Sequence, residues 1–443
     1  MLETAPRPHC AAGWILVDCA SVKHLVLSVA GLGWRDLERR GATRLAGLEF
    51  RAAESVYPAV TCVAQATLRT GLDPAAHGMT SNGWWCHATR RPSFWEQSSE
   101  LVLGPRVWDA ARAAGATVGM FFFQQSIGED VDFLVSPAHI HKHEGGSILY
   151  RYTVPPEADE ALCKANGAFP LWRYWGPLAH PKAGDACLAD FLAAAGRYDP
   201  DVAFLYLPTL DYDAQRFGPD DPRCGRAFDF FRRQLERLAA FAEKAGADLA
   251  VLGEYGIAPA ALPPALPNAA LRRAGLFAVR ELGGRAYPDF ARSKAFAMCD
   301  HEVAHVYVRD PDDVPFVRDA LAATGAYERI DAREDGGAWA HPAAGDLLLL
   351  AKAGSWCAYP WWADCREAPD YATHIDIHNK PGYDPCELFF DRGPWLHPRT
   401  CQDWGRIRGT HGRPCQVAVA ATGAPLPGDA YRALAAALPA RLR

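Results

Sequence analysis

Short apolar segments alternate with longer segments of helical spacing along most of the chain. Residues 24–34, HLVLSVAGLGW, form an apolar run ending at glycines, which is typical of a buried parallel strand that leads into a loop. Residues 107–123 predict a helix, a glycine stop and a second buried strand, and residues 185–211 and 230–256 repeat this order. The alternation predicts an α/β fold with an open, mostly parallel sheet covered by helices on both faces.

Polar side chains follow several of the predicted strands. Asp211 comes after the apolar segment VAFLYLPTL, and Glu254 comes after DLAVLG. A carboxylate next to buried apolar residues is costly unless it has a partner or a function. Ligands of parallel α/β sheets bind beyond the carboxyl ends of the strands, so we expect both carboxylates at a ligand site.

The pattern changes between residues 262 and 344, where short strands and helices predict a smaller inserted α+β lobe. The apolar segment at 345–359, GDLLLLAKAGSWCAY, predicts a return to the main sheet. We therefore expect a core of residues 20–261 and 345–425. A C-terminal helix is expected within residues 426–443.

Composition narrows the class of partner. The 443 residues are enough for two or three average domains, or for one large α/β domain with insertions. The net charge of −6 argues against nucleic acid and against a basic membrane-binding surface. No apolar run reaches about 18 residues, so no membrane span is expected. A small-molecule substrate is the expected partner, and the oligomeric state is not indicated.

The 13 cysteines are irregularly spaced and include no CxxC pair. This arrangement does not fit a disulfide scaffold, so we expect mostly reduced thiols. The first residues, MLETAPRPHCAAGW, lack the basic and apolar regions of a signal peptide. Together these features predict a cytoplasmic protein.

Four segments carry a recognisable order of polar residues. Residues 55–85, SVYPAVTCVAQATLRTGLDPAAHGMTSNGWW, place Thr61 in a Pro-x-x-Thr setting before a Thr-Gly step and a His-Gly turn. DYDAQ begins at Asp211, GEYG contains Glu254, and GTHGRP contains His411. This order resembles the alkaline phosphatase superfamily, in its type I phosphodiesterase/nucleotide pyrophosphatase branch, over most of residues 24–425.

The resemblance implies an alkaline phosphatase-like fold and a hydrolase of phosphoesters. Members of that family carry an Asp after the first strand, a Thr or Ser nucleophile, an Asp-x-x-x-His, an Asp-His-Gly and a late His-Gly. These groups hold two metal ions, usually zinc, which activate the nucleophile and clamp the phosphate oxygens. Thr61 takes the nucleophile's position, and Asn82 loosely matches the loop that contacts the phosphate; a turn-forming Asn-Gly step is the alternative role for Asn82.

The sequence departs from the family at four ligand positions, which are occupied by Ala30, Gln215, Glu254 and Tyr255. Alanine offers no ligand atom, and a neutral tyrosine is a poor one. Since zinc usually takes three or four protein ligands, we expect the metal site next to the nucleophile to be lost in its family form. The other metal site keeps Asp211 and His411.

A dense cluster of histidines and carboxylates follows in HIDIHNKPGYDP, which carries His374, Asp376, His378 and Asp384. We expect His378 to join Asp211, Glu254 and His411 in a rebuilt site for one divalent metal. Zinc is the first expectation, with manganese or iron(II) as alternatives. The alternative interpretation of the cluster is a solvated loop.

The remaining roles are assigned to residues near Thr61. Thr61, Glu254 and Tyr255 are the candidate catalytic residues, with Glu254 as a ligand or general base and Tyr255 as a hydrogen-bond donor to developing charge. A buried packing tyrosine is the alternative role for Tyr255. Without a metal, Thr61 is a substrate donor or a helix N-cap. Asn82, Gln215 and Cys62 are the candidate substrate-binding residues. Cys62 is a better intrinsic nucleophile than threonine, and its alternative role is a buried apolar cysteine.

Other polar clusters lie outside the family's ligand positions. They are His301 and His305 in CDHEVAHVYV, the histidines 139, 141 and 143 in HIHKHE, and the glutamines 124 and 125 after an apolar strand. We expect the histidines to belong to the lobe or to a lid.

Three functions remain open. The first is a metal-dependent hydrolase of a small phosphoester, phosphodiester or phosphonate. The second is a Lewis-acid or iron-dependent enzyme of another reaction type on the same fold. The third is a catalytically silent small-molecule-binding homologue. The retained carboxylates argue against a silent pocket, because uncompensated buried charge costs stability.

Overall fold

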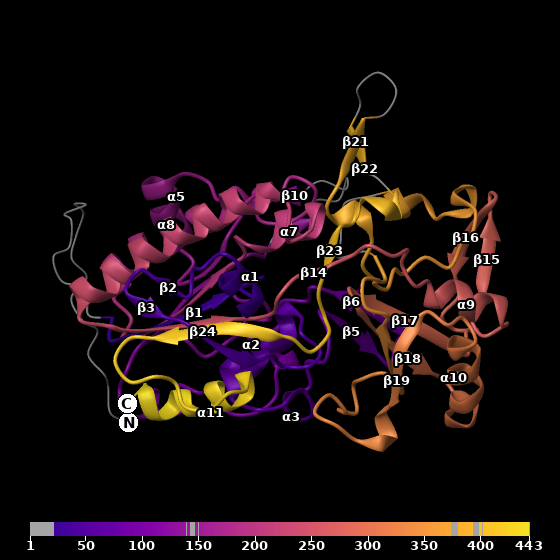
Figure 1. Cartoon of the computed structure of the whole chain (residues 1–443), viewed down its shortest axis with the longest axis horizontal. Coiled ribbons are helices and arrows are strands. Elements are labelled where there is room, and N and C mark those ends of the chain that lie inside the picture. The colour runs from indigo at the N-terminus through magenta and orange to yellow at the C-terminus, as the bar shows by residue number, and fades with distance from the viewer. Residues whose placement is uncertain are drawn as a thin grey trace.

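A computed structural model describes residues 22–138, 140–141, 147–148, 150–373, 380–392, 398–400 and 402–442. They form two adjacent units, one around a large mixed sheet and one around a smaller antiparallel sheet (Figure 1). Within these residues, no helix is both long and apolar enough to cross a bilayer. The ten cysteines among them form no disulfide bonds with one another.

The main sheet has eight strands. In spatial order they are β11 (Tyr152–Val154), β8 (Phe133–Ser136), β7 (Val118–Phe121), β12 (Val202–Leu207), β1 (His24–Val29), β13 (Asp248–Gly253), β24 (Gln416–Ala421) and β4 (Arg51–Glu54). The five strands from β8 to β13 are parallel, and the others are antiparallel to their neighbours. The predicted open, mostly parallel sheet is confirmed.

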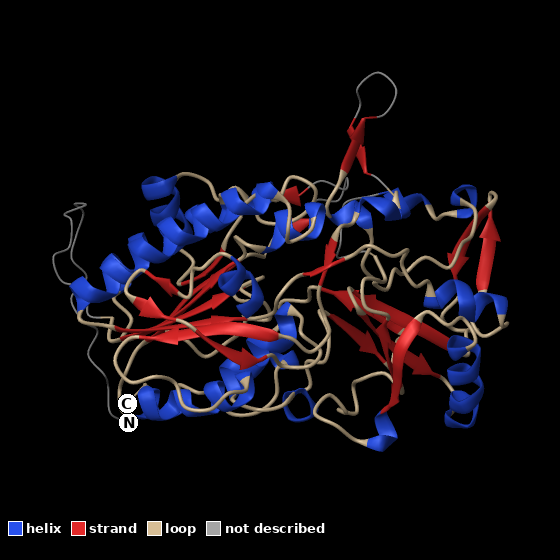
Figure 2. Cartoon of the chain, viewed as in Figure 1, coloured by secondary structure: helices blue, strands red, loops and turns tan. Residues whose placement is uncertain are grey.

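Helices cover both faces of this sheet, as the alternating pattern predicts (Figure 2). On one side lie α5 (Ala158–Asn166), α7 (Asp211–Phe217) and α8 (Pro222–Ala245), and on the other α2 (Thr61–Thr70), α3 (Pro74–His77) and α11 (Tyr431–Arg441) (Figure 1). The remaining helices of the unit are α1 (Trp34–Arg39), α4 (Asp109–Ala113) and α6 (Ala183–Tyr198). The strands of this sheet are buried on both faces. Their sequences are therefore nearly continuous apolar runs rather than alternating apolar and polar residues.

A close approach of two loops defines the carboxyl end of the sheet. A Cβ atom at Gly253, the last residue of β13, would lie 2.2 Å from the carbonyl oxygen of Leu32. Only glycine fits there, so the loop after β1 crosses directly over the end of β13. This brings the segments that follow β1, β12 and β13 to one place.

The second unit is built on a four-stranded antiparallel sheet in the order β17 (Ala295–Asp300), β18 (Val303–Val308), β20 (Leu347–Ala351) and β19 (Tyr327–Ala332). Two helices, α9 (Pro267–Arg273) and α10 (Val314–Ala322), pack on it, and a hairpin of β15 (Val279–Leu282) and β16 (Arg285–Pro288) lies at its outer edge. The prediction that residues 345–359 return to the main sheet is wrong, because β20 pairs with β18 and β19. The chain re-enters the main sheet only at β24.

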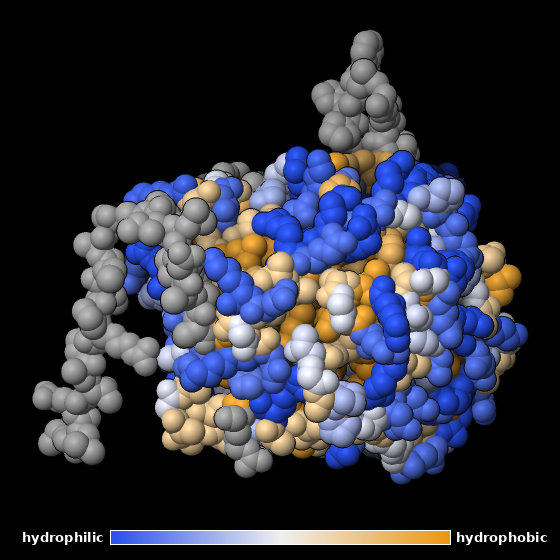
Figure 3. Space-filling model, turned by 60° about the vertical axis from the view of Figure 1, so that its left-hand side comes forward, coloured by the Kyte–Doolittle hydropathy of each residue, from blue (hydrophilic) through white to orange (hydrophobic). Residues whose placement is uncertain are grey.

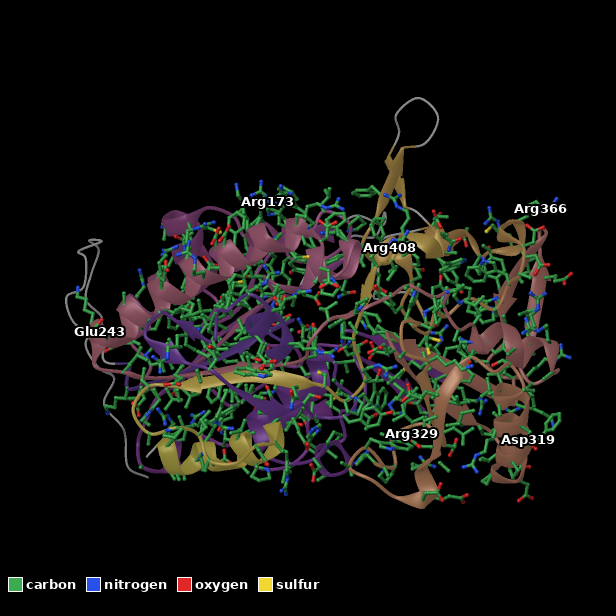
Figure 4. The ribbon with its side chains drawn as sticks, viewed as in Figure 1. Arg173, Glu243, Asp319, Arg329, Arg366 and Arg408 are labelled. Carbon is green, nitrogen blue, oxygen red and sulfur yellow. The ribbon has the colours of Figure 1, made fainter. Side chains whose placement is uncertain are left out.

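A hairpin from the first unit reaches into the second. Its strands are β5 (Gly83–Cys86) and β6 (Arg91–Phe94), and Trp85 stacks on Phe296 and Tyr307 with ring centroids 5.5 and 5.1 Å away. The burial of these large rings fixes the two units against each other. Arg408, labelled in Figure 4, lies at the same junction, just before β23 (Gly409–Thr410).

The remaining strands form two-stranded sheets: β2 (Arg44–Leu45) with β3 (Leu48–Glu49), β9 (Ile140–His141) with β10 (Ser147–Ile148), β14 (Ala258–Pro259) with β23, and β21 (Phe390–Arg392) with β22 (Pro398–Thr400). On the face shown in Figure 3, hydrophilic residues surround a central area that contains hydrophobic ones.

Candidate active site

The nucleophile segment folds as the N-terminus of a fully buried helix. Thr61 is the first residue of α2, and the preceding Val60 provides no side-chain cap. The amide N–H of Cys62 instead donates to the Asn82 side-chain oxygen at 3.0 Å. Asn82 therefore holds the first turn of α2 in place and leaves the Thr61 hydroxyl free to face the cavity described below.

A chain of hydroxyl and carboxyl groups starts at Thr61. The Thr61 Oγ1 lies 3.1 Å from the Tyr255 hydroxyl, which donates to the Asp211 carboxylate at 3.2 Å. A phenol has one hydrogen, so the Thr61 hydroxyl is the donor to Tyr255. Burial raises the pKa of Asp211, although hydrogen bonds from Gln215 and Tyr255 oppose the rise. The arrangement gives the Thr61 proton a path to a carboxylate.

Gln215 completes this chain on the far side of Asp211. Its amide nitrogen lies 2.9 and 2.8 Å from the two oxygens of Asp211, one helical turn away on α7. Its amide oxygen accepts from the Tyr383 hydroxyl at 2.9 Å. The glutamine therefore orients Asp211 and links the first unit to residue 383.

Glu254 lies beneath the site rather than on its surface. Ser28 and Gln65 both donate to its Oε1, at 2.7 and 2.9 Å, and its buried Oε2 has no partner among the described residues. Burial, opposed by these hydrogen bonds, raises the pKa of Glu254 to about 8. The side chain is therefore a neutral acid at pH 7 that supports the floor under Thr61.

Two histidines from different units stack at the site. The rings of His301 and His411 have centroids 3.9 Å apart, and Tyr255 stacks on the other side of His411 at 3.8 Å. The Nδ1 of His411 lies 2.9 Å from the carbonyl oxygen of Ala59, which requires a proton on Nδ1. Burial, and then the neighbouring His301, lower the pKa of His411 well below its usual value, so this ring is neutral.

His301 is held by a carboxylate. Its Nδ1 lies 2.9 Å from Asp300, which also accepts from the Ser81 hydroxyl at 2.8 Å and from the backbone and side-chain N–H groups of Asn82 at 2.7 and 3.0 Å. Burial alone would raise the pKa of Asp300, but these hydrogen bonds, with His301 foremost, hold it below its usual value. The backbone of His301 has a φ of 58°, a strained conformation for this residue.

These groups surround a cavity of about 360 Å³ where the two units meet. The predicted residues that line it are Thr61, Asn82, Gln124, Asp211, Gln215, Tyr255, His301 and His411. Its other walls include the aromatic residues Trp95, Tyr174, Trp175, Tyr206, Tyr212 and Tyr383. No lysine or arginine lies among the described lining residues.

Several predicted residues lie elsewhere. Cys62 is buried away from the lining; its sulfur accepts from Gln125, and burial raises the pKa of the thiol far above its usual value, so the structure supports its packing role. His305 contacts the Thr80 carbonyl instead of the cavity. Asp384 forms a buried ion pair with Lys380. His374, Asp376 and His378 lie outside the described residues, as do His139 and His143.

The structure also adds residues that the sequence did not single out for this site. Asp300, Tyr383 and Trp95 all act at the cavity or directly behind it. The adjacent Asp-His pair that ends a fully buried strand was the available signal for Asp300. Nothing in the sequence indicated that Tyr383 would meet Gln215.

The described residues do not fit the two-metal arrangement. Ala30 has no ligand atom, and the Tyr255 hydroxyl lies between Thr61 and Asp211 and bonds to both. Both oxygens of Asp211 already accept from Gln215. Across the described ranges, no three His, Cys, Asp or Glu side chains are placed to hold a metal ion together.

Comparisons with known proteins agree with this fold. Residues 24–384 match the model of the family described as type I phosphodiesterase/nucleotide pyrophosphatase. No curated protein matches the chain. Murine ectonucleotide pyrophosphatase/phosphodiesterase 5 has a similar structure, with 15% identity, 95% of each chain covered and a TM-score of 0.57.

A phosphonoacetate hydrolase from Sinorhizobium meliloti 1021, solved with phosphonoformate, is similar at 15% identity over 95% of each chain, with a TM-score of 0.59. An inactive threonine-to-alanine variant of the murine protein, solved with AMP, has 14% identity and a TM-score of 0.57, and the match covers 95% of this chain and 94% of that one. These likenesses show the fold. The match to the family model covers most of the sequence, and this protein belongs to the type I phosphodiesterase/nucleotide pyrophosphatase family of hydrolases.

Proposed function

We propose that the protein hydrolyses a small phosphoester, phosphodiester or phosphonate in the cavity, with Thr61 as the nucleophile. The observation that carries the proposal is the hydrogen-bonded chain from Thr61 through Tyr255 to Asp211. It is supported by the position of Thr61 at a helix N-terminus, where backbone N–H groups and the helix dipole favour an anion.

The first half-reaction transfers the phosphoryl group to Thr61. The Thr61 oxygen attacks phosphorus, and the Thr61 proton passes to Tyr255 as the Tyr255 proton passes to Asp211. The bond that breaks joins phosphorus to the leaving oxygen of an ester or to the leaving carbon of a phosphonate. The leaving atom takes a proton from water, which becomes hydroxide. A water molecule then attacks phosphorus and gives one proton to the hydroxide formed in the first half-reaction. The bond between phosphorus and the Thr61 oxygen breaks, Thr61 regains its proton from Asp211 through Tyr255, and the phosphate product leaves.

The other polar side chains of the site hold their neighbours in place. Glu254 is neutral and, by accepting from both side chains, joins Ser28 of β1 to Gln65 of α2. Asn82 fixes the first turn of α2 and, through Asp300, the His301 ring. The inactive threonine-to-alanine variant among the similar structures supports a threonine in the catalytic role.

Members of the family are normally metal-dependent, with zinc the usual ion. The single divalent metal expected from the sequence, held by Asp211, Glu254, His378 and His411 with zinc first and manganese or iron(II) as alternatives, stays a prediction, because His378 lies outside the described residues. A cytoplasmic location is likewise a prediction.

The test is turnover of chromogenic phosphodiesters and monoesters by wild-type protein and two Thr61 variants. Thr61→Val keeps the shape and removes the hydroxyl, and it should lose at least about a hundredfold in kcat. Thr61→Ser keeps a hydroxyl and should retain measurable turnover. Equal turnover in Thr61→Val and wild-type protein would refute Thr61 as the nucleophile.

A further inference from the structure

We propose that Glu387 is the general acid of the reaction, giving a proton to the leaving oxygen of an ester while Thr61 attacks phosphorus. The inference rests on the proposed hydrolase function and adds a residue to it. The hydrogen-bonded chain from Thr61 to Asp211 removes the proton of the nucleophile but offers none to the leaving oxygen. Glu387 takes the place of the water molecule that otherwise supplies it.

The carboxyl groups of the cavity differ in what they can do. Three carboxyl side chains line it among the described residues, those of Glu96, Asp211 and Glu387. Asp211 accepts from the Tyr255 hydroxyl and receives the Thr61 proton, so it acts as a base in the first half-reaction. Glu96 is exposed, so it lacks the burial that holds a carboxyl group in its neutral form. Glu387 is therefore the carboxyl group best suited to give a proton.

The surroundings of Glu387 keep it protonated. Burial raises the pKa of Glu387 well above the usual value for a glutamate, and the charges of Asp384 and Asp300 raise it further. Lys380 opposes the rise, but its ammonium group donates to both oxygens of Asp384, at 3.0 and 2.8 Å. Glu387 therefore enters the reaction as a neutral acid, which is the state that a general acid needs.

The acid proton of Glu387 is available to a ligand. The side chain is partly exposed at the cavity, and no side chain among the described residues forms a hydrogen bond or an ion pair with its carboxyl group. The backbone N–H of Asp384 approaches the carboxyl group, and an N–H can only donate. An oxygen atom of a bound substrate can therefore accept the Glu387 proton without displacing another acceptor of the described chain.

The backbone around Glu387 is fixed on both sides. Glu387 ends a short 3₁₀ turn, Pro385–Glu387, whose start is capped by Asp384 accepting from the Cys386 N–H at 2.6 Å. Just after the turn, the Leu388 carbonyl accepts from the buried Arg216 at 2.8 Å. Arg216 belongs to α7, the helix that begins at Asp211. The acid is thus held in a fixed relation to the helix that carries the proton acceptor.

Glu387 lies beyond the end of the hydrogen-bonded chain that is farthest from Thr61. That chain continues from Asp211 through Gln215 to the Tyr383 hydroxyl. Glu387 follows Tyr383 by four residues, and both line the cavity. In phosphoryl transfer the attacking and leaving atoms lie roughly in line on opposite sides of phosphorus. A phosphoester bound along this chain, with phosphorus next to Thr61, directs its leaving oxygen toward Glu387.

The proton balance closes with water as the only co-reactant. In the first half-reaction the bond between phosphorus and the leaving oxygen breaks, its electron pair goes to that oxygen, and the oxygen takes the proton of Glu387. In the second half-reaction the attacking water gives one proton to the Glu387 carboxylate, which restores the acid. The bond between phosphorus and the Thr61 oxygen breaks, and Thr61 regains its proton from Asp211 through Tyr255.

Two aryl methyl phosphates with different leaving phenols test this role. The p-nitrophenolate ion is a weak base that leaves without a proton, whereas phenolate is a stronger base and benefits from an acid. Glu387→Gln keeps the size and the neutral charge of the side chain but cannot give up a proton. We expect its kcat/KM to fall at least about a hundredfold for phenyl methyl phosphate and less than about tenfold for p-nitrophenyl methyl phosphate.

Two further variants locate the effect. Glu96→Gln is the matched control, since Glu96 is the other glutamate of the described lining and is exposed. It should change kcat/KM for the two esters by the same factor. Glu387→Asp keeps an acid on a shorter side chain, and it should recover part of the loss with the phenyl ester. A structural role of Glu387 would affect the two esters equally.

The wild-type protein adds a measurement that needs no variant. Its kcat/KM values for the two esters should differ by less than about tenfold, because the acid offsets the poorer leaving group, and a larger difference would overturn the inference. Equal losses for the two esters in folded Glu387→Gln would overturn the general acid and keep the hydrolase. Absence of turnover of both esters by the wild-type protein would overturn the hydrolase and this inference with it.

Discussion

Replacing Tyr255 by phenylalanine tests the hydrogen-bonded chain at its central atom. The variant removes one hydroxyl and keeps the ring, which stacks on His411 with an interplanar angle of 6°. Thr61 loses its acceptor and Asp211 loses one donor. Asp211 keeps the Gln215 amide, so it is not left without a partner.

The structure separates the expected effects on stability and on rate. Two hydrogen bonds of about 1 kcal/mol each are lost, so the free energy of unfolding should fall by about 2 kcal/mol. The proton path from Thr61 is interrupted, and general-base assistance contributes about a hundredfold to ten thousandfold in rate. A loss of at least about a hundredfold in kcat corresponds to about 2.7 kcal/mol in the activation barrier.

The assay is steady-state turnover of a chromogenic diester, with thermal or urea unfolding on the same preparations. Tyr307→Phe is the matched control, because Tyr307 is a buried tyrosine of the second unit whose hydroxyl donates to the Ala343 carbonyl. It should lose about 1 kcal/mol of stability and keep its kcat. If Tyr255→Phe keeps kcat within threefold of the wild-type value while it remains folded, the proposed path of the Thr61 proton is wrong.

Four further predictions follow from particular residues. Because the pKa of Glu254 is raised to about 8, the folded state keeps a proton on this side chain that the unfolded state releases above about pH 4.5. The free energy of unfolding should therefore fall by up to about 5 kcal/mol as pH rises from 4.5 to 8. Glu254→Gln should flatten this pH dependence when unfolding is measured by urea titration. His77 is buried and accepts from the Met79 N–H, and burial lowers the pKa of its ring to about 3. As pH falls, this histidine therefore takes up a proton in the unfolded state before it does so in the folded state. The free energy of unfolding should fall by about 2 kcal/mol between pH 7 and pH 5, and by less in His77→Gln. Arg413 forms an ion pair with the buried Glu302, so Arg413→Gln should lower the free energy of unfolding by about 3 kcal/mol, as measured by thermal unfolding. Adding Glu302→Gln to this variant should restore much of the lost stability. Additive losses from the two changes would argue against the pair. Elemental analysis of purified protein should find fewer than two equivalents of metal, with any metal lost in Asp211→Ala/His411→Ala; two equivalents would contradict the fit of the site described above.

The sequence predicted the main sheet well because its strands are buried on both faces. Continuous apolar runs such as that of β1 and β12 have few other interpretations when helices alternate with them. The same physics explains the error at β20. Its run, LLLLA, is buried throughout in the small sheet, and an apolar run alone does not say which sheet it joins.

The sequence could predict those site residues whose positions follow from the order of the strands along the chain. It could not predict those whose positions depend on the contact between the two units. Asp211 and His411 both line the cavity. Asp211 follows β12, and His411 precedes β24, which runs antiparallel to β13 and therefore begins at the carboxyl edge of the sheet. Glu254 lies one layer deeper, because its carboxyl group turns toward Ser28 on β1. The position of His301 depends on a left-handed residue in the turn between β17 and β18, and no sequence pattern encodes that conformation.

The most direct test of the account is to trap the covalent intermediate. Protein mixed with a chromogenic diester and quenched in acid within one turnover should carry the substrate's phosphoryl group on the peptide that contains Thr61, as measured by mass spectrometry. The adduct should be absent in Thr61→Val and should form more slowly in Tyr255→Phe. Turnover without an adduct, or an adduct on any other residue, would contradict Thr61 as the nucleophile.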